Sequence, residues 1–263
     1  MSIALIAGEG ILPVEIAKKL QTVQGKILIL TLRGDPEALK PYASKLIKMR
    51  VPNLGRALRE IKNFGDDSLI MAGRVPKKII YCLPLLFDKI TRSVLKKSLR
   101  DDHSLLGGVV KVFESHGIQV IPYWQILPEF IASQGKLTSR EPTKSEFYDI
   151  ESGIKILRVT LPCSFGQAVC MAGGAVVAIE AMEGTDMMIK RAGSLSGRGV
   201  VVKMIREDQD LRYDLPTVGT RTLENMHESG LTCLAVESGK TLILEPEKFF
   251  NLAEKFNIAV WGI

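Results

Sequence analysis

The chain has 263 residues, of which 46% are apolar and 24% charged, and its net charge is +6. This balance is typical of a globular protein with one large or two smaller cores, and it excludes extensive disorder. The four cysteines contain no CxxC pair, so we expect free thiols in a reducing compartment rather than a structural zinc site.

Targeting signals are not expected. Glu9 interrupts the first apolar run too early for a secretory signal, and no basic region precedes it. The longest apolar stretch, residues 168–179, is broken by Gly173-Gly174 and is shorter than the roughly 20 residues of a membrane helix. We therefore expect a cytoplasmic protein, or one attached only to a membrane surface.

The first half of the chain alternates segments typical of strands with segments typical of helices. Strands are expected at residues 3–7, 26–32, 45–51, 68–72 and 119–122, and helices at 13–20, 54–63 and 101–115. Alternation of this kind predicts an α/β domain with a mostly parallel, Rossmann-like sheet covered by helices. We assign this N-terminal domain to residues 1–130.

A polar stretch rich in turn formers follows, and we interpret residues 131–144 as a linker to a C-terminal domain of residues 145–263. That domain is expected to be mixed α/β, with Gly173-Gly174 and residues 238–240 as hairpin turns and residues 193–199 as a mobile loop. Its helices are expected at residues 145–159, 186–192, 220–229 and 246–256. Its strands are expected at residues 167–171, 175–180, 200–205, 233–237, 241–244 and 259–263.

Two glycine-containing loops of the N-terminal half are candidate phosphate sites. Ala7-Gly8-Glu9-Gly10-Ile11-Leu12-Pro13 joins the first strand to a helix N-terminus, where glycine lets the backbone approach an anion. It lacks the third glycine of GxGxxG, and Glu9 would repel a phosphate unless a metal ion intervened. Ala72-Gly73-Arg74 ends the fourth strand, and Arg74 can bind a phosphate with two hydrogen bonds. The alternatives are a plain tight turn and a surface charge.

Two further segments carry carboxylates. Arg100-Asp101-Asp102-His103 is more typical of a helix cap than of a metal site, because one helix cannot easily turn three successive ligands to one ion. Between Glu180 and Asp186, three carboxylates follow a strand, and such a cluster suits a hard cation that bridges to phosphates. Gly184 and Thr185 within it also fit an ordinary loop with a capped helix.

The last candidate is Tyr213-Asp214-Leu215-Pro216-Thr217-Val218-Gly219. Pro216 restricts the backbone, Gly219 permits a tight turn, and Thr217 or Thr220 can cap the next helix. Asp214 is thereby held in a stiff setting, which suits a carboxylate that binds a metal ion or activates water.

Three motifs in this order, in residues 7–13, 183–186 and 214–219, resemble those of the LpxI type of UDP-2,3-diacylglucosamine diphosphatase. The resemblance extends over nearly the whole chain, including Ala72-Gly73 and the terminal Val260-Trp261-Gly262. It implies two α/β domains joined by a linker with the substrate held between them, a divalent cation (usually Mg²⁺) and a homodimer.

The resemblance also implies an activity: hydrolysis of the pyrophosphate bond of UDP-2,3-diacylglucosamine to 2,3-diacylglucosamine 1-phosphate (lipid X) and UMP. This reaction belongs to lipid A synthesis at the cytoplasmic face of the inner membrane. Asp214 matches the catalytic Asp of the family's DLPTxG motif, and we expect Glu183 and Asp186 to join it as metal ligands in a catalytic C-terminal domain. The residues expected to bind substrate are Gly8, Gly10, Leu12, Gly73, Arg74, Gly184, Thr185, Thr217 and Gly219.

Two departures from the family pattern lie in the N-terminal half. Glu9 replaces a glycine of the common Ala-Gly-Gly-Gly, and residues 100–106 are one residue longer than the family's Gly-Asp-Asp-x-Leu-Leu. Both departures bear on the N-terminal binding residues more than on Asp214.

Residues 77–100 hold seven Lys and Arg against one Asp, and the resulting charge of +6 equals the net charge of the whole chain. The apolar residues among these charges, as in a helix that dips into an anionic membrane surface, are Leu83, Leu85, Leu86, Phe87, Ile90 and Leu95. A solvated helix face is the alternative. An NAD(P)-dependent oxidoreductase and a non-enzymatic lipid- or nucleic-acid-binding module are the competing functions. The resemblance favours the hydrolase, with a lipid-linked UDP-sugar as its substrate and no nucleic acid as a partner.

Overall fold

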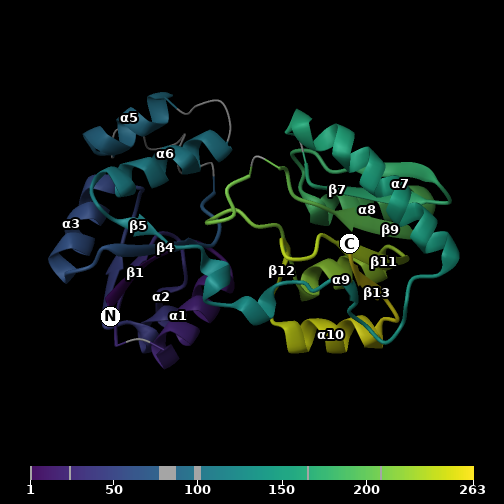
Figure 1. Ribbon diagram of the computed structural model, residues 1–263, viewed down its shortest axis with the longest axis horizontal. Coiled ribbons are helices and arrows are strands. Elements are labelled where there is room, and N and C mark those ends of the chain that lie inside the picture. The colour runs from purple at the N-terminus through teal and green to yellow at the C-terminus, as the bar shows by residue number, and fades with distance from the viewer. Residues whose placement is uncertain (1, 24, 77–86, 98–101, 165, 208) are drawn as a thin grey trace. The chain divides into compact units, whose positions relative to one another are not determined.

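The structure is a computed structural model that describes residues 2–23, 25–76, 87–97, 102–164, 166–207 and 209–263, with the backbone alone at 97 and 102–104. It divides into two compact units (Figure 1). Unit 1 comprises Met1–Pro128 and Asp210–Tyr213, and unit 2 comprises Glu129–Gln209 and Asp214–Ile263. The chain thus passes from unit 1 into unit 2 immediately before Asp214.

Unit 1 is built on a five-stranded parallel sheet, which confirms the predicted fold class. The strand order is β3-β2-β1-β4-β5. The strands are β1 (Ser2–Ala7), β2 (Lys26–Thr31), β3 (Lys45–Lys48), β4 (Ser68–Ala72) and β5 (Gln119–Val120). The helices are α1 (Leu12–Val23), α2 (Pro36–Leu39), α3 (Leu54–Phe64), α5 (Lys89–Lys97) and α6 (Asp102–Ser115), with 3-10 turns at Lys40–Tyr42 and Tyr123–Gln125.

Alternate residues of these strands face opposite layers, because successive side chains of a strand point to opposite faces. On one face Ala4, Leu28 and Met71 pack with side chains of α3 and α6, such as Ile61 and Phe113. The helix α1 contacts β1 and β2, and it buries Ile16 and Leu20, as its helical spacing predicts. Because the five strands are parallel, their carboxyl ends share one edge of the sheet.

Unit 2 contains a six-stranded mixed sheet of order β6-β13-β11-β9-β7-β8 and a separate parallel pair, β10 and β12. The central strands β13 (Ala259–Gly262), β11 (Leu231–Val236) and β9 (Gly199–Lys203) are parallel to one another. The strands β7 (Ala168–Ala172), β8 (Ala175–Ile179) and β6 (Gly135–Lys136) add antiparallel edges. The pair consists of β10 (Thr217–Val218) and β12 (Leu242–Ile243).

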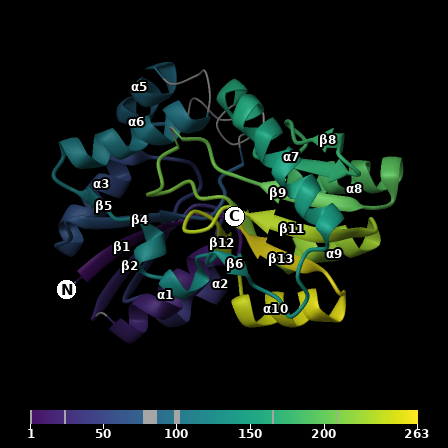
Figure 2. The same cartoon turned by 45° about the vertical axis from the view of Figure 1, so that its right-hand side comes forward.

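Helices cover both faces of this mixed sheet (Figure 2). The helix α7 (Lys144–Thr160) starts at a capping box of Thr143 and Glu146 and packs Leu157 on one face. It packs closely on β9 at Gly153, where a Cβ would lie only 2.7 Å from the Val202 side chain. The opposite face carries α8 (Thr185–Ser196), α9 (Thr220–Glu228) and α10 (Pro246–Lys255). Further 3-10 turns lie at Pro128–Phe130 and Leu161–Cys163.

Several local predictions are wrong. Residues 238–240 do not form a hairpin, because β11 belongs to the large sheet whereas β12 pairs in parallel with β10. Residues 193–196 continue α8, and Gly193 permits close contact with Ser229 rather than mobility. The stretch interpreted as a linker carries β6, and the Thr138 hydroxyl in it accepts a hydrogen bond from the Val260 amide at 2.8 Å, so this stretch packs into unit 2.

The predicted free thiols are confirmed for Cys163, Cys170 and Cys233, while Cys82 lies outside the described residues. In the described part of the chain, no helix is long and apolar enough to cross a membrane.

Candidate functional site

The two glycine loops of unit 1 meet at the carboxyl edge of the parallel sheet. The Gly8 amide donates to the Ala72 carbonyl at 2.8 Å, and the main chains of Glu9 and Arg74 exchange hydrogen bonds of 2.8 and 2.9 Å. A Cβ on Gly8 would lie 2.7 Å from the Arg74 carbonyl oxygen, so only glycine allows this approach. Gly73 needs its positive φ of 86°, which ordinary side chains rarely adopt. These loops therefore fold together as one surface.

The charges of two side chains on this surface, Glu9 and Arg74, offset each other. The Arg74 guanidinium lies 3.2 Å from the Glu9 carboxylate, and their side chains are 80% and 35% exposed. An exposed pair of this kind contributes little to stability, so the Arg74 guanidinium can change partners at little cost. Glu9 therefore has a cationic partner, which the sequence pattern did not predict. Gly10 belongs to the same loop with a φ of 104°, and Leu12 opens α1 with its side chain buried.

In unit 2, a buried lysine joins two predicted segments that are distant in sequence. Lys203 ends β9, and its ammonium donates to the Thr185 hydroxyl and to the Thr217 carbonyl, both at 3.1 Å. The Thr185 hydroxyl in turn donates to the Glu180 carboxylate at 3.0 Å. Burial lowers the pKa of Lys203, and the nearby carboxylates of Glu180 and Asp186 oppose this shift. Lys203 therefore connects the start of α8 to the segment that follows Asp214.

Sequence reasoning missed Lys203, although a signal was present. The strand reads Gly-Val-Val-Val-Lys and is buried along its whole length. A lysine that ends such a strand is exceptional, because an ammonium is almost never buried without partners. The partners are supplied by Thr185 and Thr217, which are 18 and 14 residues away in the chain. No local pattern identifies them.

The N-termini of two helices lie beside this lysine. Gly184 caps α8, Gly219 caps α9, and the two helices pack together. The Asp186 carboxylate on the first turn of α8 pairs with Arg221 on the first turn of α9. The unpaired N–H groups of a helix start favour negatively charged ligands. The structure thus brings together Gly184, Thr185, Thr217 and Gly219, whose role in binding substrate stays a prediction.

Asp214 precedes this cluster on a firmly held segment. Its carbonyl accepts a hydrogen bond of 2.7 Å from the Gln209 side chain. Leu215 and Pro216 are buried, and the Pro216 carbonyl accepts from the Leu242 amide at 2.9 Å. Val218 continues the pairing with β12 and enters the core. Asp214, itself half-buried, is held by its neighbours on both sides.

The three predicted metal ligands do not gather into a ready-made site. The Glu183 carboxylate lies 2.5 Å from the Arg191 guanidinium, whose hydrogen bond lowers the pKa of Glu183. The Asp186 carboxylate pairs with Arg221. Among the residues that the structure describes, no three His, Cys, Asp or Glu side chains are grouped to hold a metal ion. Metal binding by Asp214, Glu183 and Asp186 stays a prediction.

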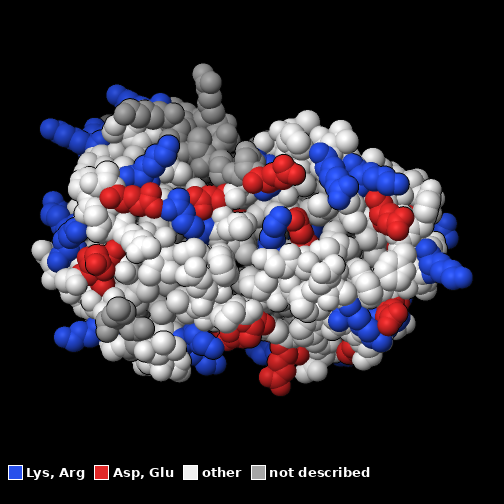
Figure 3. Space-filling view, viewed as in Figure 1, with Lys and Arg blue, Asp and Glu red and all other residues white. Residues whose placement is uncertain are grey.

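The basic segment is only partly described. Residues 77–86 and 98–101 lie outside the described residues, and with them Leu83, Leu85, Leu86, Arg100 and Asp101. In the described part, Phe87 is buried and Ile90 packs against the core of unit 1, so neither extends outward as a membrane-dipping helix would need. Lys89, Arg92 and Lys96 of α5 are exposed, and Figure 3 shows basic side chains in this region.

Two compact α/β units, one with a parallel and one with a mixed sheet, place the chain among two-domain α/β proteins. Comparison with known families is more specific. Residues 2–130 match the model of the LpxI N-terminal domain, and residues 133–261 match that of the LpxI C-terminal domain. The chain therefore belongs to the LpxI family, which confirms the resemblance of the three motifs.

A curated relative agrees with this assignment over the full length. The chain is 28% identical to the protein named UDP-2,3-diacylglucosamine pyrophosphatase LpxI of Caulobacter vibrioides. The match covers 99% of this chain and 97% of the relative, so both domains and their order are shared.

Proposed function

We propose that this protein hydrolyses the pyrophosphate bond of UDP-2,3-diacylglucosamine to lipid X and UMP, a step in lipid A synthesis. The observation that carries the proposal is the match of both LpxI domains, together with a full-length relative named for this pyrophosphatase activity. The intact Asp-Leu-Pro-Thr-Val-Gly segment at residues 214–219 supports it.

A diphosphate carries charge that must be stabilised before water can attack phosphorus. In unit 1 the paired loops offer the Arg74 guanidinium and glycine backbone for phosphate oxygens. In unit 2 the helix N-termini at Gly184 and Gly219 offer N–H groups near the buried Lys203 charge. Both groups of residues suit the same ligand chemistry.

Asp214 is proposed as the residue that activates water. As the oxygen of water bonds to phosphorus, the carboxylate accepts a proton, and the bridging oxygen departs with the other phosphate. A general base must be held in position, and the buried Leu215-Pro216 and the pairing of Thr217 provide this. Lys203 holds the Thr217 carbonyl, so it positions the segment without acting on water itself.

We also propose that Mg²⁺ assists the reaction, as the resemblance implies. Mg²⁺ usually binds through one or two protein carboxylates, several waters and the substrate's own phosphates. This requirement fits Asp214 as a ligand even though Glu183 and Asp186 pair with arginines here. Such an ion would neutralise phosphate charge and acidify bound water.

A peripheral position at the cytoplasmic face of the inner membrane and a homodimer complete the proposal. The exposed Lys89, Arg92 and Lys96 support attraction to an anionic membrane surface. Co-sedimentation with anionic vesicles should therefore weaken as salt increases, and binding that ignores salt would contradict headgroup attraction.

The decisive experiment incubates the protein with UDP-2,3-diacylglucosamine and Mg²⁺ and follows UMP and lipid X by mass spectrometry. The variant Asp214→Asn should reduce UMP release by at least 100-fold, because an amide cannot accept the proton of water. The exposed Asp67→Asn in unit 1 is the matched control and should retain full turnover. Near wild-type turnover by Asp214→Asn would exclude Asp214 as the base, and no products from the wild type would exclude the activity.

A further inference from the structure

The four residues before Asp214 belong to a different unit from the residues on either side of them. The segment Asp210–Tyr213 is part of unit 1, whereas Gln209 and Asp214 are both part of unit 2. The main chain therefore leaves unit 2 after Gln209 and returns to it at Asp214. Contacts that hold this segment in unit 1 also restrict the backbone of Asp214, because the peptide bond that joins it to Tyr213 is rigid and planar.

A hydrogen bond within unit 2 closes the base of this segment. The side-chain nitrogen of Gln209, a buried residue, donates to the Asp214 carbonyl at 2.7 Å. The side-chain oxygen of Gln209 accepts from the Gln167 side chain at 2.6 Å. The Gln167 amide in turn donates to the Glu180 carboxylate at 3.1 Å. Because the Gln209 side chain both accepts and donates, it cannot turn over without losing both hydrogen bonds.

Within the segment, Arg212 binds carboxylates on two sides. Its guanidinium donates to both oxygens of Asp210, at 3.0 and 2.7 Å, and to the Glu114 carboxylate on α6. Burial opposes ionisation of Asp210, but the hydrogen bonds from Arg212 prevail and lower its pKa. A guanidinium that binds a carboxylate with two hydrogen bonds is fixed in direction. Asp210 therefore holds the Arg212 guanidinium toward Glu114.

Tyr213 provides a second contact with α6. Its side chain packs against the hydrophobic cluster of unit 1, and a Cβ on Gly107 would lie 3.6 Å from its hydroxyl oxygen. Gly107 and Glu114 are seven residues apart, so they lie on one face of α6 about two turns from each other. Arg212 and Tyr213 thus contact the same helix face at two points, immediately before Asp214.

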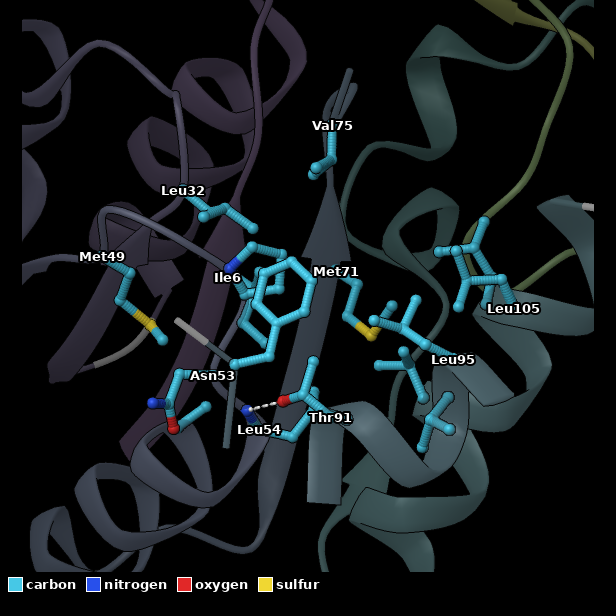
Figure 4. Close-up of a pocket in the computed structure, with 16 residues that line it drawn as sticks. Ile6, Leu32, Met49, Asn53, Leu54, Met71, Val75, Thr91, Leu95 and Leu105 are labelled. Carbon is cyan, nitrogen blue, oxygen red and sulfur yellow. Dashed lines mark hydrogen bonds between the residues drawn. The ribbon is translucent and has the colours of Figure 1, made fainter. Parts of the chain in front are cut away.

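Helix α6 can support the segment because its other side is packed in unit 1. Val110 and Phe113 are buried in the hydrophobic cluster of this unit. Figure 4 shows Leu105 of α6 at an apolar cavity between the helices and the parallel sheet. Glu114, in contrast, is exposed. The carboxylate that Arg212 contacts is therefore carried by a helix whose position the core fixes.

The ion pair of Arg212 and Glu114 lies at the surface, with side chains 34% and 41% exposed. Exposed ion pairs contribute little to folding stability, so loss of this pair should leave the protein folded. A displacement of about 1 Å at a catalytic group, in contrast, can cost about 100-fold in rate. Loss of the pair should therefore affect catalysis far more than stability.

We propose that Arg212 and Glu114 are positioning residues, through which helix α6 of unit 1 sets the place of the Asp214 carboxylate. Their role in catalysis rests on the proposed function of Asp214, whereas the anchoring of Asp210–Tyr213 on α6 does not. Arg212 acts on Asp214 through the backbone between them. Its loss should therefore lower kcat and leave KM unchanged.

The first test measures steady-state UMP release from UDP-2,3-diacylglucosamine with Mg²⁺. Glu114→Met and Arg212→Met should each lower kcat about tenfold with KM unchanged, and the double variant should lose no more than Arg212→Met alone, because both substitutions remove the same contact. Glu114→Asp, which keeps the carboxylate, should retain more activity than Glu114→Met. The matched control is Glu60→Met, which breaks an exposed ion pair with Lys45 in the same unit and should retain full turnover. A kcat of Glu114→Met equal to that of Glu60→Met would overturn the positioning role, as would a higher KM at unchanged kcat.

The second test needs no turnover and measures hydrogen–deuterium exchange by mass spectrometry. The Arg212 amide donates to the Asp210 carboxylate at 3.0 Å, so it should exchange slowly in the wild type. In Glu114→Met, exchange in the peptide that covers Asp210–Tyr213 should become about tenfold faster, because the segment opens more often, and in Glu60→Met it should stay unchanged. Equal exchange rates in the three proteins would overturn the anchoring on α6. If the wild type releases no UMP, the proposed function fails, and the exchange rates alone decide whether α6 anchors the segment.

Discussion

Replacing Lys203 by methionine removes an ammonium group and two hydrogen bonds while keeping an unbranched apolar stem. Each hydrogen bond from a charged donor contributes about 1.5–3 kcal/mol, so roughly 3–6 kcal/mol of contact energy is lost. The buried ammonium also carries a desolvation cost, which lowers its pKa, and methionine avoids that cost, so much of the loss is offset although Glu180 and Asp186 lose a nearby cation. We therefore expect the free energy of unfolding to change by no more than about 2 kcal/mol.

The effect on catalysis should be much larger than the effect on stability. Without Lys203, the Thr217 carbonyl loses its link to the start of α8, and the segment after Asp214 can shift. A misplacement of about 1 Å at a catalytic group can cost about 100-fold in rate. Steady-state UMP release should therefore fall about 100-fold, with urea unfolding measured in parallel.

The matched control for this substitution is Lys190→Met on the exposed side of α8, which should leave both quantities unchanged. A Lys203→Met enzyme whose kcat/KM stayed within threefold of the wild type would refute the positioning role. A loss of activity accompanied by global unfolding would also refute the expected separation of the two effects.

Three further predictions follow from local structure and from the family. Burial opposes ionisation of Glu146, but hydrogen bonds from Arg140, the Thr143 amide and Thr232 dominate and lower its pKa from 4.5 to about 2. This shift corresponds to about 3 kcal/mol of stability, which is present above pH 4.5 and is lost as pH falls through 2. The free energies of unfolding in urea of Glu146→Gln and the wild type should therefore converge in acid. A difference that stays constant with pH would contradict this. Gly73→Ala should lower Tm, because it places a Cβ 2.7 Å from Pro13 at a residue with positive φ. Gly25→Ala, which has open space around its Cβ, should leave Tm unchanged. Equal Tm values for the two variants would refute the strain at Gly73. Chelation with EDTA should stop UMP release and Mg²⁺ should restore it, and activity that survives chelation would remove the metal ion from the mechanism.

Much of unit 1 could be predicted because its signals are local. The short apolar run of β1, which is buried almost throughout, and the helical spacing of Leu54, Leu58 and Ile61 in α3 are both local signals. The helix begins after the N-cap Asn53 and ends before the αL residue Gly65, within one residue of the predicted range 54–63. Parallel strands place their carboxyl ends on one edge, which is why the loops at Gly8 and Gly73 could each be named as a candidate, whereas their contact was shown only by the structure.

Unit 2 was less predictable because its decisive pairings are distant in sequence. Ser238-Gly239-Lys240 has the composition of a hairpin turn, yet the strand after it pairs with Thr217-Val218. Gly193 suggested a mobile loop, but a neighbouring helix requires its small size. Composition indicates where the backbone can turn. It does not indicate which distant strand or helix the following segment pairs with or packs against.

The sequence by itself determined the α/β class, the motifs that indicate the family and Asp214 as the residue to test, since each depends on residues close together in the chain. Only the tertiary structure showed that Glu9 pairs with Arg74 and that Lys203 joins Thr185 to Thr217. Only it showed that Arg212 joins the segment before Asp214 to helix α6. These features arise from charges and side chains that meet across long chain separations, and burial and electrostatics there depend on every neighbour at once.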